Sequence, residues 1–337
     1  MNGPIDIIIP WVDGSDPEWQ AEKEKYMQKT EADADANSIV RYQSWDNLQY
    51  LFRGIEKFMP WVNKVYFVTW GHLPEFLNTD CPKLQIVRHE NFIPREYLPT
   101  FNANVIESNF HRIEGLSENY IYFNDDMFPL TSIAETYYFK NDKVCDEAVE
   151  TPIIPVDIGP ISSWGCAARA NNVLFINKHF KKQEVIKKNR KKWFTLAYGP
   201  LLKRNIVMRY WHNFAGFHDP HVPSAFKKQS LNEIWDTDYA LMDAVGRNKF
   251  RAGNDVTQYM VRYWQLCKGD FYPRRTLGKC FYVDMNNYKY VAEGIRTQKW
   301  QMICMNENCE GEEFEMIKTE IAKAFETILP EKCSFEK

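Results

Sequence analysis

The chain has 337 residues, a formal net charge of −3 and a sequence pI near 6.2, with 45% hydrophobic and 26% charged residues. These values are typical of a soluble globular protein with one large domain or two moderate ones, and they give no overall case for nucleic-acid binding. The first apolar run, residues 5–12, is short and contains Asp6, and no run of about twenty apolar residues follows. We therefore expect neither a signal peptide nor a membrane span.

The eight cysteines are scattered along the chain. Without a secretory signal, this distribution is typical of reduced, mostly structural thiols. Cys304 and Cys309 stand close together, but no second pair stands at the spacing of a zinc finger. The sequence therefore predicts no zinc site.

The first strand is predicted at residues 5–10, and it leads directly into the loop WVDGSDP. Such a loop can present backbone N–H groups and a carboxylate to a nucleotide. It is also an ordinary strand-to-helix turn, with Asp16 as the N-cap and Pro17 at the first helical position. Both interpretations are compatible.

Helices and strands then alternate. Helices are predicted at residues 18–29, 41–58 and 98–109, and further strands at 64–70, 84–87 and 120–123, with Thr100 or Asn102 as a helix cap. This order predicts an α/β fold with a mostly parallel sheet. The sequence has no GxGxxG or GxxxxGK[ST] loop, which disfavours a dinucleotide-binding Rossmann site and a P-loop.

The strand at residues 120–123 ends at Asn124, Asp125 and Asp126. Two carboxylates at the end of a buried strand are costly to hold without a counter-charge. Because ligands of open α/β sheets bind beyond the strand C-termini, the pair is a candidate site for a divalent metal and a phosphorylated ligand. The alternative is an Asx turn, in which the side-chain oxygens cap the backbone.

The middle of the chain changes character. Residues 151–163 are predicted to form a loop, and residues 178–209 are strongly basic with interleaved aromatic side chains. Such a run is usually a solvated helix face, but it can also attract an anionic polymer, a lipid headgroup or a phosphate. The candidate residues of this platform are Lys191, Lys192 and Arg204. The acidic NDD run and the near-neutral net charge argue against single-stranded nucleic acid as its ligand.

Residues 210–223 concentrate His212, His218 and His221 in a loop rich in proline and glycine, without a helical HExxH arrangement. Helices are predicted at residues 226–235, 238–245 and 250–265, and the last of these has Asn254 or Asp255 near its start, with Arg251 just ahead of it. A guanidinium there suits phosphate recognition, whereas the alternative is a surface ion pair. A last strand and a last helix are predicted at residues 300–305 and 312–329.

Four blocks, at residues 5–19, 41–130, 217–265 and 299–337, resemble the Stealth family. The second block, which begins RYQSWDNLQYLFRG and ends YIYFNDDMF, carries the most specific likeness, and the fourth, with QMICMNENCE, the weakest. The family contains bacterial capsular polysaccharide phosphotransferases and the catalytic subunit of the enzyme that places N-acetylglucosamine-1-phosphate on lysosomal enzymes. The chain departs from the family pattern at Ser44 and Trp45, and Asn306 and Asn308 stand where the family has an Asn-Asp pair.

The resemblance implies transfer of a sugar-1-phosphate from a nucleotide sugar, such as UDP-GlcNAc, to an acceptor hydroxyl. A nucleoside monophosphate leaves, and a phosphodiester forms in a capsular or surface polysaccharide. It implies Mg²⁺, or alternatively Mn²⁺, at Asp125 and Asp126. The implied catalytic residues are His221, Arg251 and Asp126, with either His221 or Asp126 as the base. The implied nucleotide-sugar ligands are Trp11, Val12, Asp13, Gly14, Ser15, Arg41, Asn102 and Asn104.

The expected fold is α/β, with a GT-A-like, mostly parallel sheet flanked by helices and an inserted basic helical subdomain. The expected parts are a nucleotide-sugar-binding part at residues 1–164, the insertion at 165–245 and a C-terminal part at 246–337. We expect a cytoplasmic enzyme, with peripheral contact at the inner face of the membrane as an option. The competing functions are a metal-dependent glycosyltransferase that transfers the sugar alone, and a non-catalytic carbohydrate-binding protein.

Overall fold

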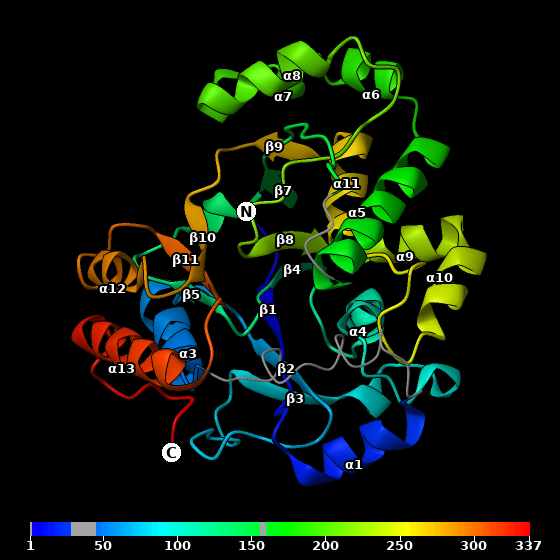
Figure 1. Ribbon diagram of the computed structural model, residues 1–337. Coiled ribbons are helices and arrows are strands. Elements are labelled where there is room, and N and C mark those ends of the chain that lie inside the picture. Colours follow the sequence, from blue (N-terminus) through cyan, green and yellow to red (C-terminus); the bar gives the residue numbers. More distant parts are fainter. Residues whose placement is uncertain (1, 28–44, 156–159) are drawn as a thin grey trace.

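The computed structural model describes residues 2–27, 45–155 and 160–337, and for residues 160–163 it describes the backbone only. Its centre is a five-stranded sheet in the order β3-β2-β1-β4-β8 (Figure 1). The strands are β1 (Ile5–Pro10), β2 (Val65–Thr69), β3 (Leu84–Arg88), β4 (Asn119–Tyr122) and β8 (Ser224–Lys227). The first four strands of this order are parallel, which confirms the predicted α/β class with a mostly parallel sheet.

The inner strands are apolar because helices and loops cover both faces of the sheet. Every residue of β2 and β4 is buried, as are the first five residues of β1. Such continuous runs of Ile, Val, Tyr and Phe are typical of parallel strands buried on both sides. The predicted strands at residues 5–10, 64–70, 84–87 and 120–123 are therefore confirmed.

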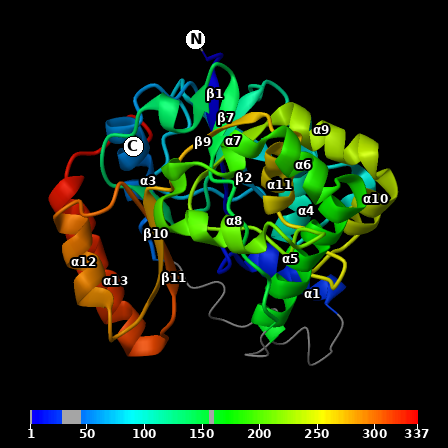
Figure 2. The same cartoon turned by 90° about the horizontal axis from the view of Figure 1, so that it is seen from above.

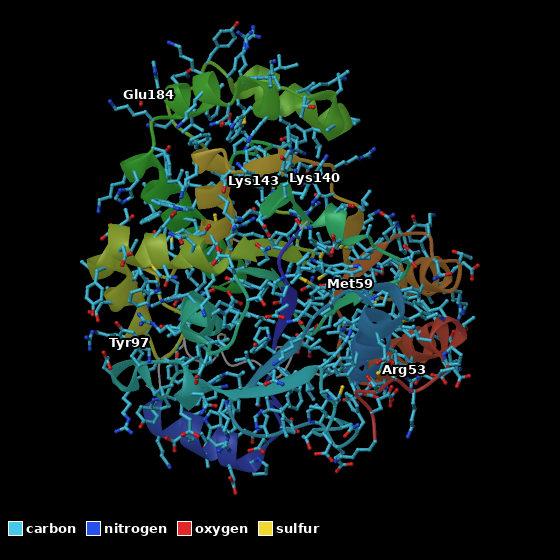
Figure 3. All side chains as sticks on the ribbon, turned by 180° about the vertical axis from the view of Figure 1, so that it is seen from behind. Arg53, Met59, Tyr97, Lys140, Lys143 and Glu184 are labelled. Atoms are coloured by element: carbon cyan, nitrogen blue, oxygen red, sulfur yellow. The ribbon has the colours of Figure 1, made fainter. Side chains whose placement is uncertain are left out.

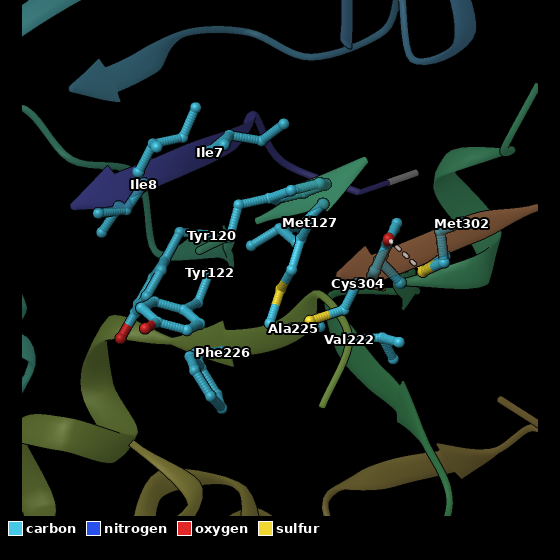
Figure 4. Packing of buried hydrophobic residues seen from close by; sticks show 14 of the residues in the cluster. Ile7, Ile8, Tyr120, Tyr122, Met127, Val222, Ala225, Phe226, Met302 and Cys304 are labelled. Atoms are coloured by element: carbon cyan, nitrogen blue, oxygen red, sulfur yellow. Dashed lines mark hydrogen bonds between the residues drawn. The ribbon is translucent and has the colours of Figure 1, made fainter. Parts of the chain in front are cut away.

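Strand β8 differs from the prediction. It pairs antiparallel with β4, with Tyr122 opposite Ser224, although the sequence pattern predicted a helix from residue 226. The ring of Phe226 packs on Tyr120 and Tyr122, so its side chain completes the sheet instead of starting the helix (Figure 4). A strand of the central sheet thus lies inside the predicted insertion at residues 165–245.

Helices surround this sheet. The helix predicted at residues 18–29 begins at Pro17, and its cap is Asp16, whose side chain accepts a 2.8 Å hydrogen bond from the backbone N of Trp19. Four helices belong to the first group: three come from the N-terminal half of the chain, and the fourth directly follows β8. They are α1 (Pro17–Tyr26), α3 (Leu48–Phe58), α4 (Ala103–Ser108) and α9 (Lys228–Thr237).

A second group of helices comes from the middle of the chain. These are α5 (Pro160–His179), α6 (Lys182–Lys188), α7 (Arg190–Trp193), α8 (Leu202–Met208), α10 (Tyr239–Gly246) and α11 (Tyr259–Lys268). Figures 1 and 2 show α6, α7 and α8 as an outer layer, with Glu184 at its far end in Figure 3. The predicted loop at residues 151–163 ends earlier than expected, because α5 begins at Pro160.

Two smaller sheets were not predicted. One has the order β10-β11-β5, and the other has the order β6-β7-β9. Their strands are β5 (Met127–Pro129), β6 (Phe139–Lys140), β7 (Lys143–Asp146), β9 (Phe271–Pro273), β10 (Gly278–Val283) and β11 (Met302–Glu307). The pairing of β11 with β5 brings the C-terminal part of the chain against the segment that follows Asp126.

The C-terminal helices α12 (Tyr288–Arg296) and α13 (Gly311–Ile328) pack together on the side of α3, as Figure 2 shows. The predicted helix at residues 312–329 is thus confirmed. Arg53 of α3 pairs with Glu336 through a 2.8 Å contact and donates to the carbonyl oxygen of Leu329, which fixes the chain end beside this helix (Figure 3). Among the described residues, no helix combines the length and the apolar character that crossing a bilayer requires.

Candidate active site

The candidate site lies at one edge of the central sheet, where β1, β2 and β4 end and β8 begins. Because β8 runs antiparallel to β4, its first residue, Ser224, stands opposite Tyr122, the last residue of β4. The loop that carries His221 therefore meets the Asn124–Asp126 segment directly. This edge is where ligands of open α/β sheets bind.

The end of β4 is held from both sides. The side-chain N of Asn124 lies 3.4 Å from Nε2 of His221, and its side-chain oxygen is in contact with the hydroxyl oxygen of Tyr122. Asp126 accepts a 3.3 Å contact from the Sγ of Cys304 on β11, and its backbone oxygen accepts from Met305. His221 and β11 thus both contact this turn, although they lie 97 and 178 residues further along the chain.

Three carboxylates lie near one another here: Asp125 and Asp126 in the turn, and Glu307 at the end of β11. Desolvation and then the charge of Asp126 raise the pKa of Asp125 to about 7, and the charge of Glu307 adds to the shift. The side chain of Asp125 is exposed, so we give the neighbouring carboxylates more weight than desolvation in that shift. Desolvation and the charge of Asp126 raise the pKa of Glu307 in the same way.

These carboxylates are the candidate ligands for a hard divalent cation, although the three do not all come within 4.8 Å of one another. Oδ1 of Asp126 is buried and has no hydrogen-bond partner among the described residues, and desolvation raises the pKa of this carboxyl. An orphaned carboxylate oxygen beside further carboxylates is the donor set that Mg²⁺ or Mn²⁺ prefers. The amide nitrogen of Asn306 donates to the sulfur of Cys280 over 3.1 Å. Sequence reasoning missed Glu307, which stands between the two asparagines that drew attention there.

His221 has a backbone φ of 49°, a region that costs a residue other than glycine about 1–3 kcal/mol. The buried guanidinium of Arg262 holds the residues just before His221 in this loop. Arg262 donates to the carbonyl oxygen of His218 over 2.6 Å and to Asp219 over 3.2 Å, and it pairs with Asp146 over 2.8 Å. The strained residue is thus held by the structure around it, which is common at functional sites.

The three histidines of this loop have different environments. The Nδ1 of His218 lies 2.9 Å from the carboxylate of Glu147, so His218 anchors the loop, and His212 is exposed. Only His221 faces Asn124. Burial lowers the pKa of His221, but the hydrogen bond with Cys280 and the charge of Asp126 outweigh it, and the net shift is upward.

Glu107 of α4 is a buried carboxylate that sequence reasoning treated only as part of a helix. Its Oε1 accepts a 2.6 Å hydrogen bond from the hydroxyl of Tyr122, and its Oε2 is buried without a partner among the described residues. Desolvation raises the pKa of Glu107 to about 7, and the nearby charges of Arg251 and His221 limit the rise. Glu107 thus links electrostatically the two residues that the sequence singled out separately.

Arg251 lies in a loop ahead of α11, and this helix begins only at Tyr259, later than the sequence predicted. One buried carboxylate, Asp255, organises that loop. It accepts five hydrogen bonds of 2.7–3.1 Å, two from Asn102 and one each from Asn104, Asn248 and the backbone N of Ala252. The guanidinium of Arg251 itself has no hydrogen-bond or ion-pair partner among the residues that the structure describes.

Asn102 and Asn104, two of the predicted nucleotide ligands, bind Asp255 in the structure. Asn102 is fully buried, caps α4 by accepting from the backbone N of Asn104, and donates to Asp255. It cannot contact a nucleotide, which corrects the prediction. Asn104 is half-buried and also donates to Asp255. Both side chains hold the Arg251 loop against α4.

The predicted N-terminal loop follows β1 at the same edge of the sheet. Oδ1 of Asp13 accepts from the backbone N and the hydroxyl of Ser15, and the backbone N of Asp13 donates to Nε2 of His72 over 2.7 Å. Trp11 packs edge-on against the same imidazole. Val12 is half-buried and Gly14 is buried. Arg41 lies outside the described residues.

The basic platform is only partly available. Lys191 and Arg204 are exposed, and Arg204 donates to Thr151 over 2.8 Å. Lys192 instead donates over 2.5 Å to the carbonyl oxygen of Gly269, which ends α11, and burial lowers its pKa. A cation at a helix C-terminus is structural, so Lys192 is removed from the platform.

Comparisons with known proteins agree with the predicted family. Residues 3–31 match Stealth protein conserved region 1, and residues 41–146 match conserved region 2. A capsular polysaccharide phosphotransferase of Streptococcus pneumoniae is 35% identical, with 99% of this chain and 98% of the relative covered. An exopolysaccharide phosphotransferase of Lactiplantibacillus plantarum is 34% identical, with 100% and 98% covered.

Solved structures add little. Mouse xyloside xylosyltransferase 1 aligns with 91% of this chain and 98% of its own at 8% identity, but the TM-score of 0.36 is too low to support a conclusion. The relatives, in contrast, match along the whole chain. The chain therefore belongs to the Stealth family of phosphotransferase enzymes.

Proposed function

We propose that this enzyme transfers a sugar-1-phosphate from a nucleotide sugar to an acceptor sugar hydroxyl during synthesis of a surface polysaccharide. The donor is a UDP-sugar such as UDP-GlcNAc, the product is a phosphodiester, and the leaving group is a nucleoside monophosphate. The names of the relatives support phosphate transfer in capsular and exopolysaccharide synthesis. The observation that carries the proposal is the convergence of Asp126, His221 and Glu107 at one sheet edge, with Arg251 close enough for its charge to act on Glu107.

The reaction needs charge stabilisation at the pyrophosphate and in-line placement of the acceptor. Asp125 and Asp126, with Glu307 beside them, are the residues that would hold Mg²⁺ or Mn²⁺. When bound there, the ion would neutralise charge on the pyrophosphate. Desolvation raises the pKa of all three carboxyls, and the charge of Asp126 adds to the shifts of Asp125 and Glu307.

His221 is the proposed general base. It takes the proton of the acceptor hydroxyl as the new bond to the β-phosphorus forms, and the bond between that phosphorus and the bridging oxygen breaks. Its raised pKa lies above the ordinary value near 6.5, so the imidazole gains basicity from Asp126 and Cys280. Asp126 is the competing candidate base.

Arg251 is the proposed electrostatic partner of the transferred phosphate. Its guanidinium has no protein partner among the described residues, and the network around Asp255 fixes its loop. A guanidinium presented in this way can bind two phosphate oxygens at once. Glu107 lies close enough to Arg251 for its pKa to respond to that charge, and it would orient the guanidinium.

The loop from Trp11 to Ser15 is the proposed nucleotide side of the site. The exposed cations Lys191 and Arg204 are proposed to attract an anionic acceptor or a membrane surface. Exposed apolar side chains flank them, which suits contact with a lipid-linked acceptor. These are Leu196, Val207, Tyr210 and Trp211.

The test uses the purified protein with Mg²⁺, an oligosaccharide acceptor and a panel of nucleotide sugars. We expect a nucleoside monophosphate and a ³¹P phosphodiester signal. Release of a nucleoside diphosphate would show transfer of the sugar alone, and sugar binding without turnover would show a binding protein. His221→Ala should lower kcat by about 10²–10⁴-fold. If it keeps the pH–rate limb of the wild type, His221 is not the base.

A further inference from the structure

A cluster of soft metal ligands lies against the proposed catalytic residues. An imidazole nitrogen of His221 and the Sγ atoms of Cys280 and Cys304 all lie within 4.8 Å of one another. Among the described residues, this is the one group of three or more His, Cys, Asp or Glu side chains that meets this spacing. The sequence predicted no zinc site, because no second pair stands at zinc-finger spacing beside Cys304 and Cys309. The cysteines of this cluster are instead 24 residues apart in the chain.

The sheet β10-β11-β5 brings the thiols together. Cys280 of β10 and Cys304 of β11 are paired residues of two parallel strands, so their side chains leave the same face of the sheet. Met127 is the partner of Cys304 on the other side, and Figure 4 shows Cys304 next to Met127 and Val222, the residue after His221. The ligands therefore come from rigid elements and from a loop that Arg262 fixes.

The spacing suits a tetrahedral ion. Zinc–sulfur bonds of about 2.3 Å and zinc–nitrogen bonds of about 2.0 Å place neighbouring ligand atoms about 3.3–3.8 Å apart in a tetrahedron. Atoms within 4.8 Å of one another reach that separation by a shift of about 1 Å or by rotation of side chains. Two thiols and an imidazole favour Zn²⁺ strongly over Mg²⁺, which prefers oxygen.

Asp126 borders this cluster. Its Oδ2 lies 3.3 Å from the Sγ of Cys304, but its oxygens do not come within 4.8 Å of all three ligand atoms. Catalytic Cys₂His zinc sites keep their fourth position for a water or a substrate. Asp126 therefore connects this cluster with the carboxylates of the proposed Mg²⁺ site.

We propose that His221, Cys280 and Cys304 form a binding site for Zn²⁺ or another thiophilic divalent cation, whose occupancy inhibits the enzyme. Binding itself follows from the ligand cluster alone. Inhibition rests on the proposed function, because the ion would occupy the imidazole of the proposed base and lie beside Asp126, a carboxylate of the proposed Mg²⁺ site. Zn²⁺ and Mg²⁺ would then compete, although they favour different ligands.

The binding test does not require turnover. The full-length protein, reduced and freed of metal, is titrated with Co²⁺, whose thiolate charge-transfer absorption reports sulfur ligation. We expect this absorption in the wild type and its displacement by Zn²⁺. Cys280→Ser should abolish it and weaken Zn²⁺ binding by more than about 100-fold, since loss of even an outer-shell partner costs up to about that much. Cys309→Ser is the control, because that thiol instead contacts the backbone of Val283.

The outcomes separate binding from function. Absence of the Co²⁺ band, or its persistence in Cys280→Ser, overturns the proposed site whether or not the enzyme turns over. Cys280 is half-buried and Cys304 is buried, so Cys280→Ser should disturb the fold less than Cys304→Ser. The melting temperature of the variant verifies that it is folded. For inhibition, each variant is compared with and without Zn²⁺. We expect Zn²⁺ to inhibit the wild type and Cys309→Ser, and excess Mg²⁺ to reduce that inhibition, whereas equal inhibition of Cys280→Ser contradicts the inhibitory role.

Discussion

The network around Asp255 gives the sharpest test of how the Arg251 loop is positioned. In Asp255→Asn, one carboxylate oxygen becomes an NH₂ group that faces amide donors. Asn102 contacts both oxygens and keeps one of them, so the change removes either the bond from Asn248 or those from Asn104 and the backbone N of Ala252. Hydrogen bonds to a charged acceptor contribute about 1.5–3 kcal/mol each, so the loop loses roughly 1.5–6 kcal/mol.

A loss of that size exceeds what a surface loop can absorb, so we expect the segment at residues 248–255 to open locally. Arg251 would then leave its position, and kcat/KM should fall about 10²–10³-fold, as it does when a preorganised charge-stabilising donor is removed. Steady-state kinetics of donor cleavage measure this effect. The exposed residue Asp236 provides the control, and Asp236→Asn should leave kcat/KM unchanged.

A double-mutant cycle decides whether Asp255 acts through Arg251. Arg251→Ala alone should cost about as much as Asp255→Asn. In the Arg251→Ala background, Asp255→Asn should lower kcat/KM by less than about threefold. If the two losses multiply instead, Asp255 does not act by positioning this guanidinium, and the reasoning is refuted.

Three further predictions follow from other contacts. The pKa of Glu107 is raised from 4.5 to about 7, so the stability that this carboxyl contributes is complete below about pH 4.5 and is lost as the pH rises through 7. The free energy of unfolding of Glu107→Gln, measured in urea, should therefore rise relative to that of the wild type by up to about 3 kcal/mol between about pH 4.5 and pH 8. The same difference between variant and wild type at both pH values would contradict this. Arg262→Met leaves Asp146 and Asp219 buried without their partner and should cost about 3–5 kcal/mol of unfolding free energy, whereas a cost below about 1 kcal/mol would show that the pair does not anchor the loop. Lys191→Glu should raise the KM for an anionic acceptor in low salt while leaving the KM for the donor unchanged. Unchanged acceptor kinetics would refute the proposed role of Lys191 in attracting the acceptor.

Local patterns predicted much of the fold. The run at residues 5–10, the cap at Asp16 and the stripe of the last helix all depend on neighbours within a few residues. The NDD turn was predictable for the same reason, because a buried apolar strand ends abruptly at charged side chains. His221 and Arg251 were assigned from the family resemblance, and the structure brings both near Glu107.

What the sequence did not predict depends on long-range pairing. Residues 226–227 have a helical pattern, but they form a strand because Phe226 packs on tyrosines about a hundred residues earlier. Asn102 was taken for a ligand because nothing nearby in the sequence shows that Asp255 will accept its hydrogen bonds. The thiols of Cys280 and Cys304 meet only through the register of β10 and β11.

The central claim is that the bond cleaved lies between the two phosphates of the donor. It is tested most directly with a UDP-sugar labelled with ³²P at the β-phosphate, incubated with the enzyme, Mg²⁺ and acceptor. Our account predicts that the label moves into the acceptor product while unlabelled UMP is released. Recovery of the label in UDP, with an unlabelled glycosylated acceptor, would contradict it.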